Sequence, residues 1–161
     1  MASTQSVALF NTLSRKVEAI KTYEEGKVRM YSCGPTVYNI AHIGNLRTFL
    51  FQDLLKRVLS ASGFSITHCM NITDVEDKII RDSQVGLAPD VSNADRLLRM
   101  HEFTDQFSRI FFQDLEALKI LPATVYPKAT NHIPEMISMI DQLIQKDLAY
   151  PREGSVYFRV K

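Results

Sequence analysis

The hydrophobic and polar positions in the first half of the chain predict a strand, a helix and a second strand. Residues 27–33 partly alternate polar with apolar side chains and end at a Gly-Pro pair, which predicts a strand followed by a tight loop. From Leu46 the apolar residues recur at helical spacing until Gly63, a typical C-terminal stop. A second strand is expected over residues 64–70. Because parallel strands need a crossover connection, this order predicts a parallel sheet covered by helices.

The second half predicts two helices and a hairpin. Residues 84–90 contain Gly and Pro and indicate a linker, after which Ser92 and Asp95 resemble an N-cap pair. A long helix follows, with one face made of Leu97, Met100, Thr104, Phe107, Phe111, Leu115 and Leu118. The helix expected from Asn131 has a predicted buried side made of Ile133, Met136, Ile137, Ile140, Leu143 and Ile144. Residues 149–160 are expected to form a terminal hairpin.

These elements define an α/β chain that begins with half of a nucleotide-binding fold. The first part is expected to be the first half of a Rossmann-like parallel sheet, and the second a mostly helical insertion that ends in the hairpin. A sheet of two or three strands leaves edges that a complete fold would pair or cover, so we expect a truncated piece of a larger protein.

Composition excludes several classes of protein. The 161 residues are 45% hydrophobic with a net charge of +1, which fits a globular chain without a basic stripe for nucleic acid. Cys33 and Cys69 form no disulfide framework, which predicts a reducing, cytoplasmic location. The polar start at residues 1–6 is not a secretory signal, and no apolar run is long enough to predict a membrane span.

The most informative segment is residues 33–45, Cys-Gly-Pro-Thr-Val-Tyr-Asn-Ile-Ala-His-Ile-Gly-Asn, which leads from the first strand into the helix. Ligands of open α/β sheets bind at this end of a strand. A helix N-terminus stabilises a triphosphate, His42 and Asn45 can add side-chain donors, and Gly44 lets a nucleotide approach the backbone. Taken singly, His42 also suits a helix start, Asn45 an N-cap and Cys33 a small buried group.

Together these residues resemble the signature region of class I aminoacyl-tRNA synthetases, whose family motif is His-Ile-Gly-His, and specifically that of the cysteinyl enzymes. The resemblance extends through residues 9–13, 71–80 and 127–133, and so covers nearly the whole chain. It implies that residues 1–84 form the first half of the class I catalytic domain, which is Rossmann-like. Residues 85–161 would then form an incomplete connective insertion.

The resemblance implies a cysteine–tRNA ligase. Cysteine would attack the α-phosphate of ATP, which enters with magnesium, and the cysteinyl group would pass to the 3′ end of the tRNA. Carried over by position, His42 and Asn45 would contact the ATP phosphates beside Gly44 and stabilise the charge that develops during adenylation. The implied partners are the tRNA for cysteine, L-cysteine and ATP. The oligomeric state stays open, with a monomer favoured.

Cys33 matches a zinc ligand of this family, in which the substrate thiolate completes the coordination shell. Zinc binds a thiolate strongly and a hydroxyl weakly, which gives a route to selecting cysteine over serine. Thr36 and Thr73 match positions that hold the substrate amino acid, with loop or helix capping as the alternative. The family's other zinc ligands and its Lys-Met-Ser-Lys-Ser loop come from the second half of the fold. We therefore expect this chain to end before them and to be inactive alone.

The other polar candidates are interpreted as structural. Asn45 replaces the last histidine of the motif and keeps a hydrogen-bond donor without a titratable proton. Cys69 falls on a strand where packing is expected, and His101 and His132 have no predicted partners and are assigned to structure or to an RNA-facing surface. An acidic cluster is expected to complement a helix dipole instead of binding metal. It consists of Asp74, Glu76 and Asp77.

Two other functions remain as alternatives. One is the related ATP-dependent ligase that joins cysteine to an amino-sugar pseudodisaccharide and resembles the same motifs. The other is a non-catalytic fragment that binds a nucleotide.

Overall fold

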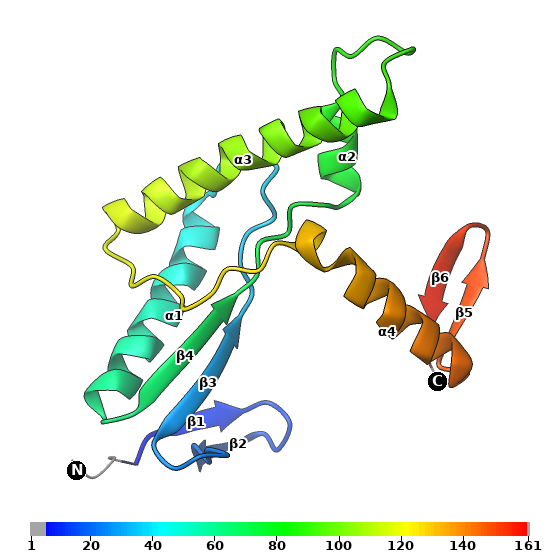
Figure 1. Cartoon of the computed structure of the whole chain (residues 1–161). Coiled ribbons are helices and arrows are strands. Elements are labelled where there is room, and N and C mark those ends of the chain that lie inside the picture. Colours follow the sequence, from blue (N-terminus) through cyan, green and yellow to red (C-terminus); the bar gives the residue numbers. More distant parts are fainter. Residues whose placement is uncertain (1–5, 161) are drawn as a thin grey trace.

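A small parallel sheet with a helical crossover forms the centre of the computed structural model, which describes residues 6–160 (Figure 1). Strand β3 (Lys27–Ser32) pairs in parallel with β4 (Ser65–Met70), in a register that joins Lys27 to Ser65 and Ser32 to Met70. Helix α1 (Ile43–Ala61) connects the two strands. The predicted strand, helix and strand are confirmed, and so is the mixed α/β class.

The C-terminal end of α1 lies where the sequence predicts it, and the helix begins at Ile43, before the apolar spacing that starts at Leu46. His42 is the N-cap residue, and Gly63 follows the helix with a φ of 91°, a left-handed conformation that glycine adopts without strain. The chain then turns directly into β4, because the backbone N–H of Phe64 donates to the carbonyl of Leu59 at 3.1 Å. Leu59 is buried at this corner, so the helix end is fixed by packing as well as by the glycine.

The sheet continues on the other side of β4 through a segment for which the sequence predicts no strand. Residues 124–129 run parallel to β4, with bridges that join Cys69 to Val125 and Ile72 to Lys128. The backbone N–H of Ile72 donates to the carbonyl of Pro127 at 2.8 Å. A proline has no N–H of its own but still offers an acceptor, so it suits the edge of a sheet.

Helix α3 (Asn93–Ala117) covers this sheet together with α1 (Figure 1). Ser92 caps it by accepting a hydrogen bond from the backbone N–H of Asp95, as predicted. Phe49 of α1 meets Phe111 of α3 edge to face, with ring centroids 5.1 Å apart. The shared core consists of Val37, Phe49, Met70, Ile72, Phe111, Leu115 and Ile120. This core draws on both sides of the predicted domain boundary at residue 84.

The face predicted for α3 is buried only in part. Its middle is buried at Met100, Thr104, Phe111 and Leu115. The ends are not, since Leu97 is 52% exposed and Leu118 is 38% exposed. Short helix α2 (Asp77–Ser83) follows the sheet before the linker and was not predicted as a separate element.

Helix α4 (Ile133–Gln145) corrects a second prediction. It follows the 3-10 turn η1 (Ala129–His132) and contains no buried residue. The side chains expected to be buried at Ile133, Met136, Ile137 and Ile140 are instead 37–54% exposed, and Leu143 and Ile144 are partly buried. Figure 1 shows the reason, because α4 extends away from the sheet toward the terminal hairpin. The periodicity identifies the apolar side but not what covers it.

Two antiparallel hairpins flank these elements. The terminal one, β5 (Ala149–Arg152) and β6 (Ser155–Phe158), was predicted and turns through Glu153 and Gly154, both at positive φ. The N-terminal one, β1 (Ala8–Asn11) and β2 (Lys16–Ala19), was not predicted. Residues 1–5 and 161, which include most of the segment considered as a secretory signal, lie outside the described residues.

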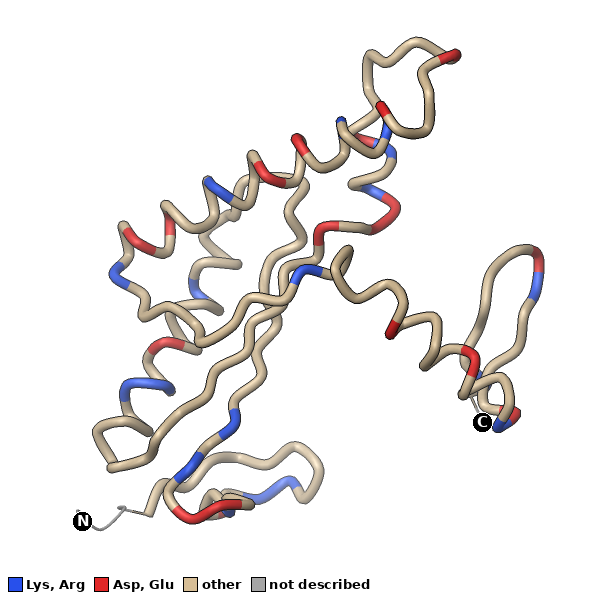
Figure 2. Tube along the Cα trace, in the orientation of Figure 1, with Lys and Arg blue, Asp and Glu red and all other residues tan. Residues whose placement is uncertain are grey.

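Charge is distributed without a basic face along the described trace. Figure 2 shows acidic and basic positions intermixed on α3 and at the N-terminal end of the sheet. None of the helices formed by residues 6–160 combines the length and the apolarity needed to cross a membrane.

Candidate nucleotide and amino-acid site

A cavity of about 340 Å3 opens at the carboxyl end of β3 and the N-terminus of α1. The loop between these two elements forms one wall, the start of α2 a second, and aromatic side chains of α3 a third. Its polar side chains come from Thr36, Tyr38, Asn39, His42, Asn45, Glu76 and Lys78. The cavity therefore lies where ligands of open α/β sheets bind.

His42 and Asn45 form a reciprocal capping box at the start of α1. The backbone N–H of Gly44 donates to Nδ1 of His42 at 3.1 Å, and the backbone N–H of His42 donates to Oδ1 of Asn45 at 3.2 Å. Because Nδ1 is an acceptor here, the neutral ring carries its proton on Nε2 and can donate from there. Because Asn45 accepts through Oδ1, its side-chain NH2 group can likewise donate to a ligand. Both side chains line the cavity, so each caps the helix and can donate to a ligand.

Gly44 has a local reason to be a glycine. A Cβ at this position would lie 2.9 Å from Cε1 and 3.0 Å from Nδ1 of His42. A larger residue would therefore push the imidazole out of the capping box. Gly44 itself does not line the cavity, and its proposed contact with a nucleotide stays a prediction.

Gly34 and Asn71 are structural residues of the site that the sequence analysis missed. A Cβ on Gly34 would lie 1.8 Å from the backbone oxygen of Asn71, closer than any real contact. The Oδ1 atom of Asn71 accepts from the backbone N–H of Gly34 at 3.2 Å and from the Tyr31 hydroxyl at 2.9 Å. These contacts join the ends of β3 and β4, and the Gly-Pro pair after a strand was the available signal.

Thr36 and Thr73 are brought together by the backbone. They form a parallel bridge. The N–H of Val37 donates to the carbonyl of Thr73 at 3.1 Å, and the N–H of Thr73 donates to the carbonyl of Pro35 at 3.0 Å. Only Thr36 lines the cavity. The hydroxyl of Thr73 accepts from the side-chain amide of Asn71 at 3.1 Å.

Cys33 is exposed at the end of β3, next to this site but outside the cavity lining. Its Sγ lies 3.7 Å from the carbonyl oxygen of Gly34. Zinc takes three or four protein ligands, and residues 6–160 contain no group of three or more His, Cys, Asp or Glu side chains that could hold a metal ion. Cys33 alone therefore does not make a zinc site.

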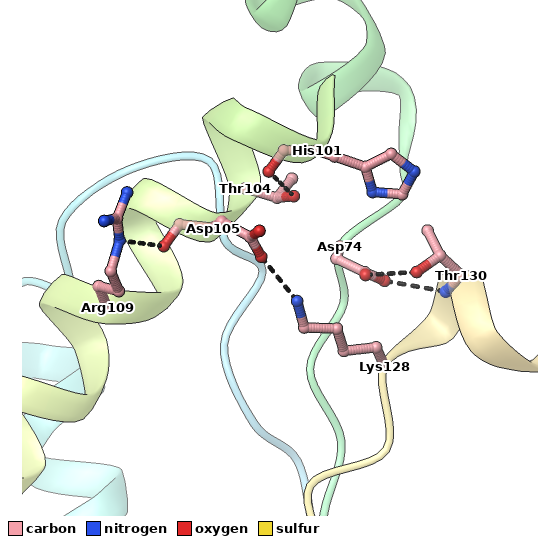
Figure 3. A network of polar contacts seen from close by, with 7 residues as sticks. All are labelled: Asp74, His101, Thr104, Asp105, Arg109, Lys128 and Thr130. Atoms are coloured by element: carbon pink, nitrogen blue, oxygen red, sulfur yellow. Dashed lines mark hydrogen bonds and ion pairs between the residues drawn. The ribbon is translucent and has the colours of Figure 1, made fainter. Parts of the chain in front are cut away.

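The acidic cluster separates into three different environments, which corrects its interpretation as a helix-dipole group. Only Asp77 lies in the first turn of α2. Asp74 is 1% exposed and its carboxylate accepts from the hydroxyl and the backbone N–H of Thr130 at 2.6 and 2.9 Å (Figure 3). Glu76 is the N-cap residue of α2 but makes no side-chain cap, and it lines the cavity. Asp74 and Thr130 are 56 residues apart, and a contact between such distant positions leaves no local pattern, so the role of Asp74 could not be predicted from the sequence.

Lys78 was also missed as a site residue. Its ammonium lies 5.0 Å from the centre of the Tyr38 ring, and both side chains line the cavity. This cation–π contact holds a positive charge beside the loop that follows β3. The remaining candidates are peripheral: Cys69 is partly buried in β4, and His132 lies 4.0 Å from Glu135.

Two parallel strands, a crossover helix and a cavity at the helix N-terminus define an open α/β fold of the Rossmann-like type. The chain belongs to the family described as tRNA synthetases class I (C) catalytic domain, whose sequence model matches residues 19–161.

Several similar proteins are named cysteine–tRNA ligases. The protein from Methanosarcina mazei is 44% identical over 152 residues, which are 94% of this chain and 30% of the relative. The proteins from Brachyspira hyodysenteriae and Chlamydia felis are 41% and 42% identical and cover 97% and 99% of the chain. The chain thus spans about 30% of the length of these relatives.

A solved structure from Campylobacter jejuni, assigned as an arginyl-tRNA synthetase, has the same fold. It superposes with a TM-score of 0.63 at 14% identity and covers 86% of this chain and 38% of its own. At this identity the likeness concerns the fold alone.

Proposed function

We propose that this chain is the ATP- and cysteine-binding part of a cysteine–tRNA ligase that acts in the cytoplasm. The whole protein would activate cysteine as cysteinyl-adenylate and transfer it to the tRNA for cysteine. Residues 1–84 would form the first half of the catalytic domain, and residues 85–161 would begin its connective insertion. The observation that carries the proposal is the capping box of His42 and Asn45, which directs two donors into a cavity at a helix N-terminus.

This arrangement suits the phosphates of ATP. The N-terminus of a 19-residue helix carries positive partial charge, and anions bind there. We assign phosphate contacts to His42 and Asn45, and a close backbone approach to Gly44. Because the capping hydrogen bonds already fix both side chains, the donors would be in place before ATP binds. Such preorganised donors stabilise charge that develops in an adenylation step.

The substrate cysteine would bind beside the phosphates. Thr36 lies on the cavity wall and Thr73 is its backbone partner, so we assign both to amino-acid contacts. We assign Cys33 to a zinc site that needs further ligands from outside the described residues. Zinc would supply selectivity for the substrate thiolate over a hydroxyl.

The ATP and cysteine site can be tested in a chimera. This chain would replace the matched segment of the Methanosarcina mazei relative, and cysteine-dependent ATP–pyrophosphate exchange would be measured. Exchange should be restored in the chimera and should fall by about 100-fold with His42→Ala, the effect typical of removing one preorganised donor. A Cys69→Ser chimera serves as a control, because Cys69 lies outside the cavity lining. Exchange that is unaffected by His42→Ala would contradict the assigned site.

The amino-sugar ligase is the alternative that shares the same first step. In the native full-length protein, cysteine-dependent exchange without any charging of tRNA would favour that enzyme. The names of the relatives support the tRNA ligase.

A further inference from the structure

Glu76 has a carboxylate oxygen that is buried and has no hydrogen-bond partner. Its Oε1 belongs to the few side-chain oxygens and nitrogens of the described residues that are shielded from solvent without a partner. A buried acceptor without a partner costs free energy, and more so when it is charged. Such an atom in a cavity wall indicates a ligand that donates to it.

The Glu76 side chain does not cap the helix that it precedes. Glu76 is the N-cap residue, with φ −168° and ψ 172°, and an acidic side chain there would ordinarily accept from the first N–H groups of the helix. Glu76 makes no such bond. Glu76 lines the cavity instead, together with His42 and Asn45 of the α1 capping box.

The charges around the cavity limit which part of a ligand meets Glu76. The α1 N-terminus, His42 and Asn45 present donors and positive partial charge, and they suit phosphate. A carboxylate repels phosphate and accepts hydrogen bonds only. The ligand group that complements this carboxylate is therefore a cationic donor. Lys78, a cation of the same lining, lies over the Tyr38 ring, and the Glu76 Oε1 atom has no partner among the described residues.

We propose that Glu76 binds the α-ammonium group of the amino-acid substrate. This assignment rests on the proposed function, because it takes the ligand to be an amino acid joined to adenylate. Thr36 lines the same cavity and would contact the rest of that amino acid. Glu76 thereby becomes a specificity residue that distinguishes an amino acid from a carboxylic acid without the amine.

The test uses two non-hydrolysable probes. One is cysteinyl-sulfamoyl-adenosine, and the other is its desamino counterpart, in which hydrogen replaces the ammonium group. Binding of both would be measured by calorimetry with this chain in the Methanosarcina mazei chimera described above, as the unaltered sequence, Glu76→Gln and the control Asp77→Asn. Asp77 is an adjacent acidic residue that is exposed and does not line the cavity.

The unaltered chain should prefer the amino probe by roughly ten-fold or more, the scale of a hydrogen bond to a charged group. Glu76→Gln should reduce this preference to about three-fold or less without lowering the affinity for the desamino probe. Asp77→Asn should retain the preference of the unaltered chain. An unchanged preference in Glu76→Gln would overturn the assignment, and so would an equal loss for both probes. If the folded chimera with the unaltered chain binds neither probe, the proposed function fails together with the role of Glu76. Binding of both probes with equal affinity would instead refute the role of Glu76 alone.

Discussion

The contact between Asp74 and Thr130 should be a strong single contributor to stability. It joins the segment after β4 to η1, 56 residues later, and the hydroxyl of Thr130 donates to the Asp74 carboxylate at 2.6 Å (Figure 3). Asp74 is 1% exposed, so water cannot replace a lost donor. Hydrogen bonds to charged groups contribute about 1.5–3 kcal/mol. Thr130→Val removes this donor, preserves the side-chain volume and keeps the backbone N–H bond, so we expect a loss in that range.

The exposed ion pair beside it provides a matched comparison. Lys128 pairs with Asp105 at 2.7 Å, but the two side chains are 36% and 55% exposed. Exposed pairs contribute about 0.2–1 kcal/mol, because solvent screens them. Lys128→Met should therefore cost much less than Thr130→Val, although both contacts connect the same segment to the body of the fold. Thr130→Ser retains the hydroxyl and should recover most of the loss.

Urea and thermal unfolding followed by far-ultraviolet circular dichroism would measure these differences. For a chain of this length, 1 kcal/mol corresponds to a shift in Tm of roughly 2–4 °C. The predicted order of stability is unaltered chain, Lys128→Met and then Thr130→Val. Equal losses for Lys128→Met and Thr130→Val would refute the argument that burial determines the contribution.

Four further predictions concern other parts of the fold. Gly34→Ala would place a Cβ 1.8 Å from the backbone oxygen of Asn71 and should lower the free energy of unfolding by about 3 kcal/mol or more. Gly154→Ala should cost only about 1 kcal/mol, because a Cβ there would meet nothing within 4 Å and only the positive φ of 79° is unfavourable. Equal urea midpoints for the two variants would contradict this difference. Asn45→Ala removes one half of the capping box and should cost about 1 kcal/mol, with a smaller loss for Asn45→Asp, as unfolding curves would show. Burial, assisted by the nearby Lys56, lowers the pKa of His68 below its ordinary value of 6.5. The unfolded state therefore binds more protons than the folded state below that pH, and stability should fall as the pH drops through about 6.5. His68→Gln should weaken this dependence of stability on pH between about pH 7.5 and 5.5. After dialysis the chain should hold less than one equivalent of zinc, because Cys33 provides only a single ligand. Stoichiometric zinc in a metal analysis would contradict the conclusion that Cys33 alone does not make a zinc site.

The parts of the fold that the sequence predicts are those set by neighbours along the chain. Helix α1 has an apolar period, a polar N-cap and a C-terminal Gly63, and its ends fall where these signals lie. Ser92 and the turn at Glu153 and Gly154 are local signals of the same kind. The failures depend on contacts between distant segments. Pairing of residues 124–129 with β4 joins positions more than 50 residues apart, and no local pattern marks it.

The candidate site divides in the same way. His42, Gly44 and Asn45 could be selected because they are close in sequence and occur in a recognised order. Glu76 and Lys78 come from the start of α2, and no partner for their carboxylate and ammonium can be recognised in the sequence. Exposure of the α4 face shows the same limit, because hydrophobic periodicity identifies an apolar side without specifying what covers it.

The replacement of the last motif histidine by Asn45 can be understood from the capping box. What the helix start requires at this position is an acceptor for the backbone N–H of His42, and the Asn45 side-chain oxygen provides it at 3.2 Å. The asparagine therefore preserves the orientation of His42, although it cannot carry a positive charge. Lys78 provides a full positive charge in the cavity lining, held beside Tyr38. The cavity lining thus combines side-chain donors fixed by the helix start with a separate cation from α2, so the site that we propose for phosphate keeps a full positive charge without a histidine at position 45.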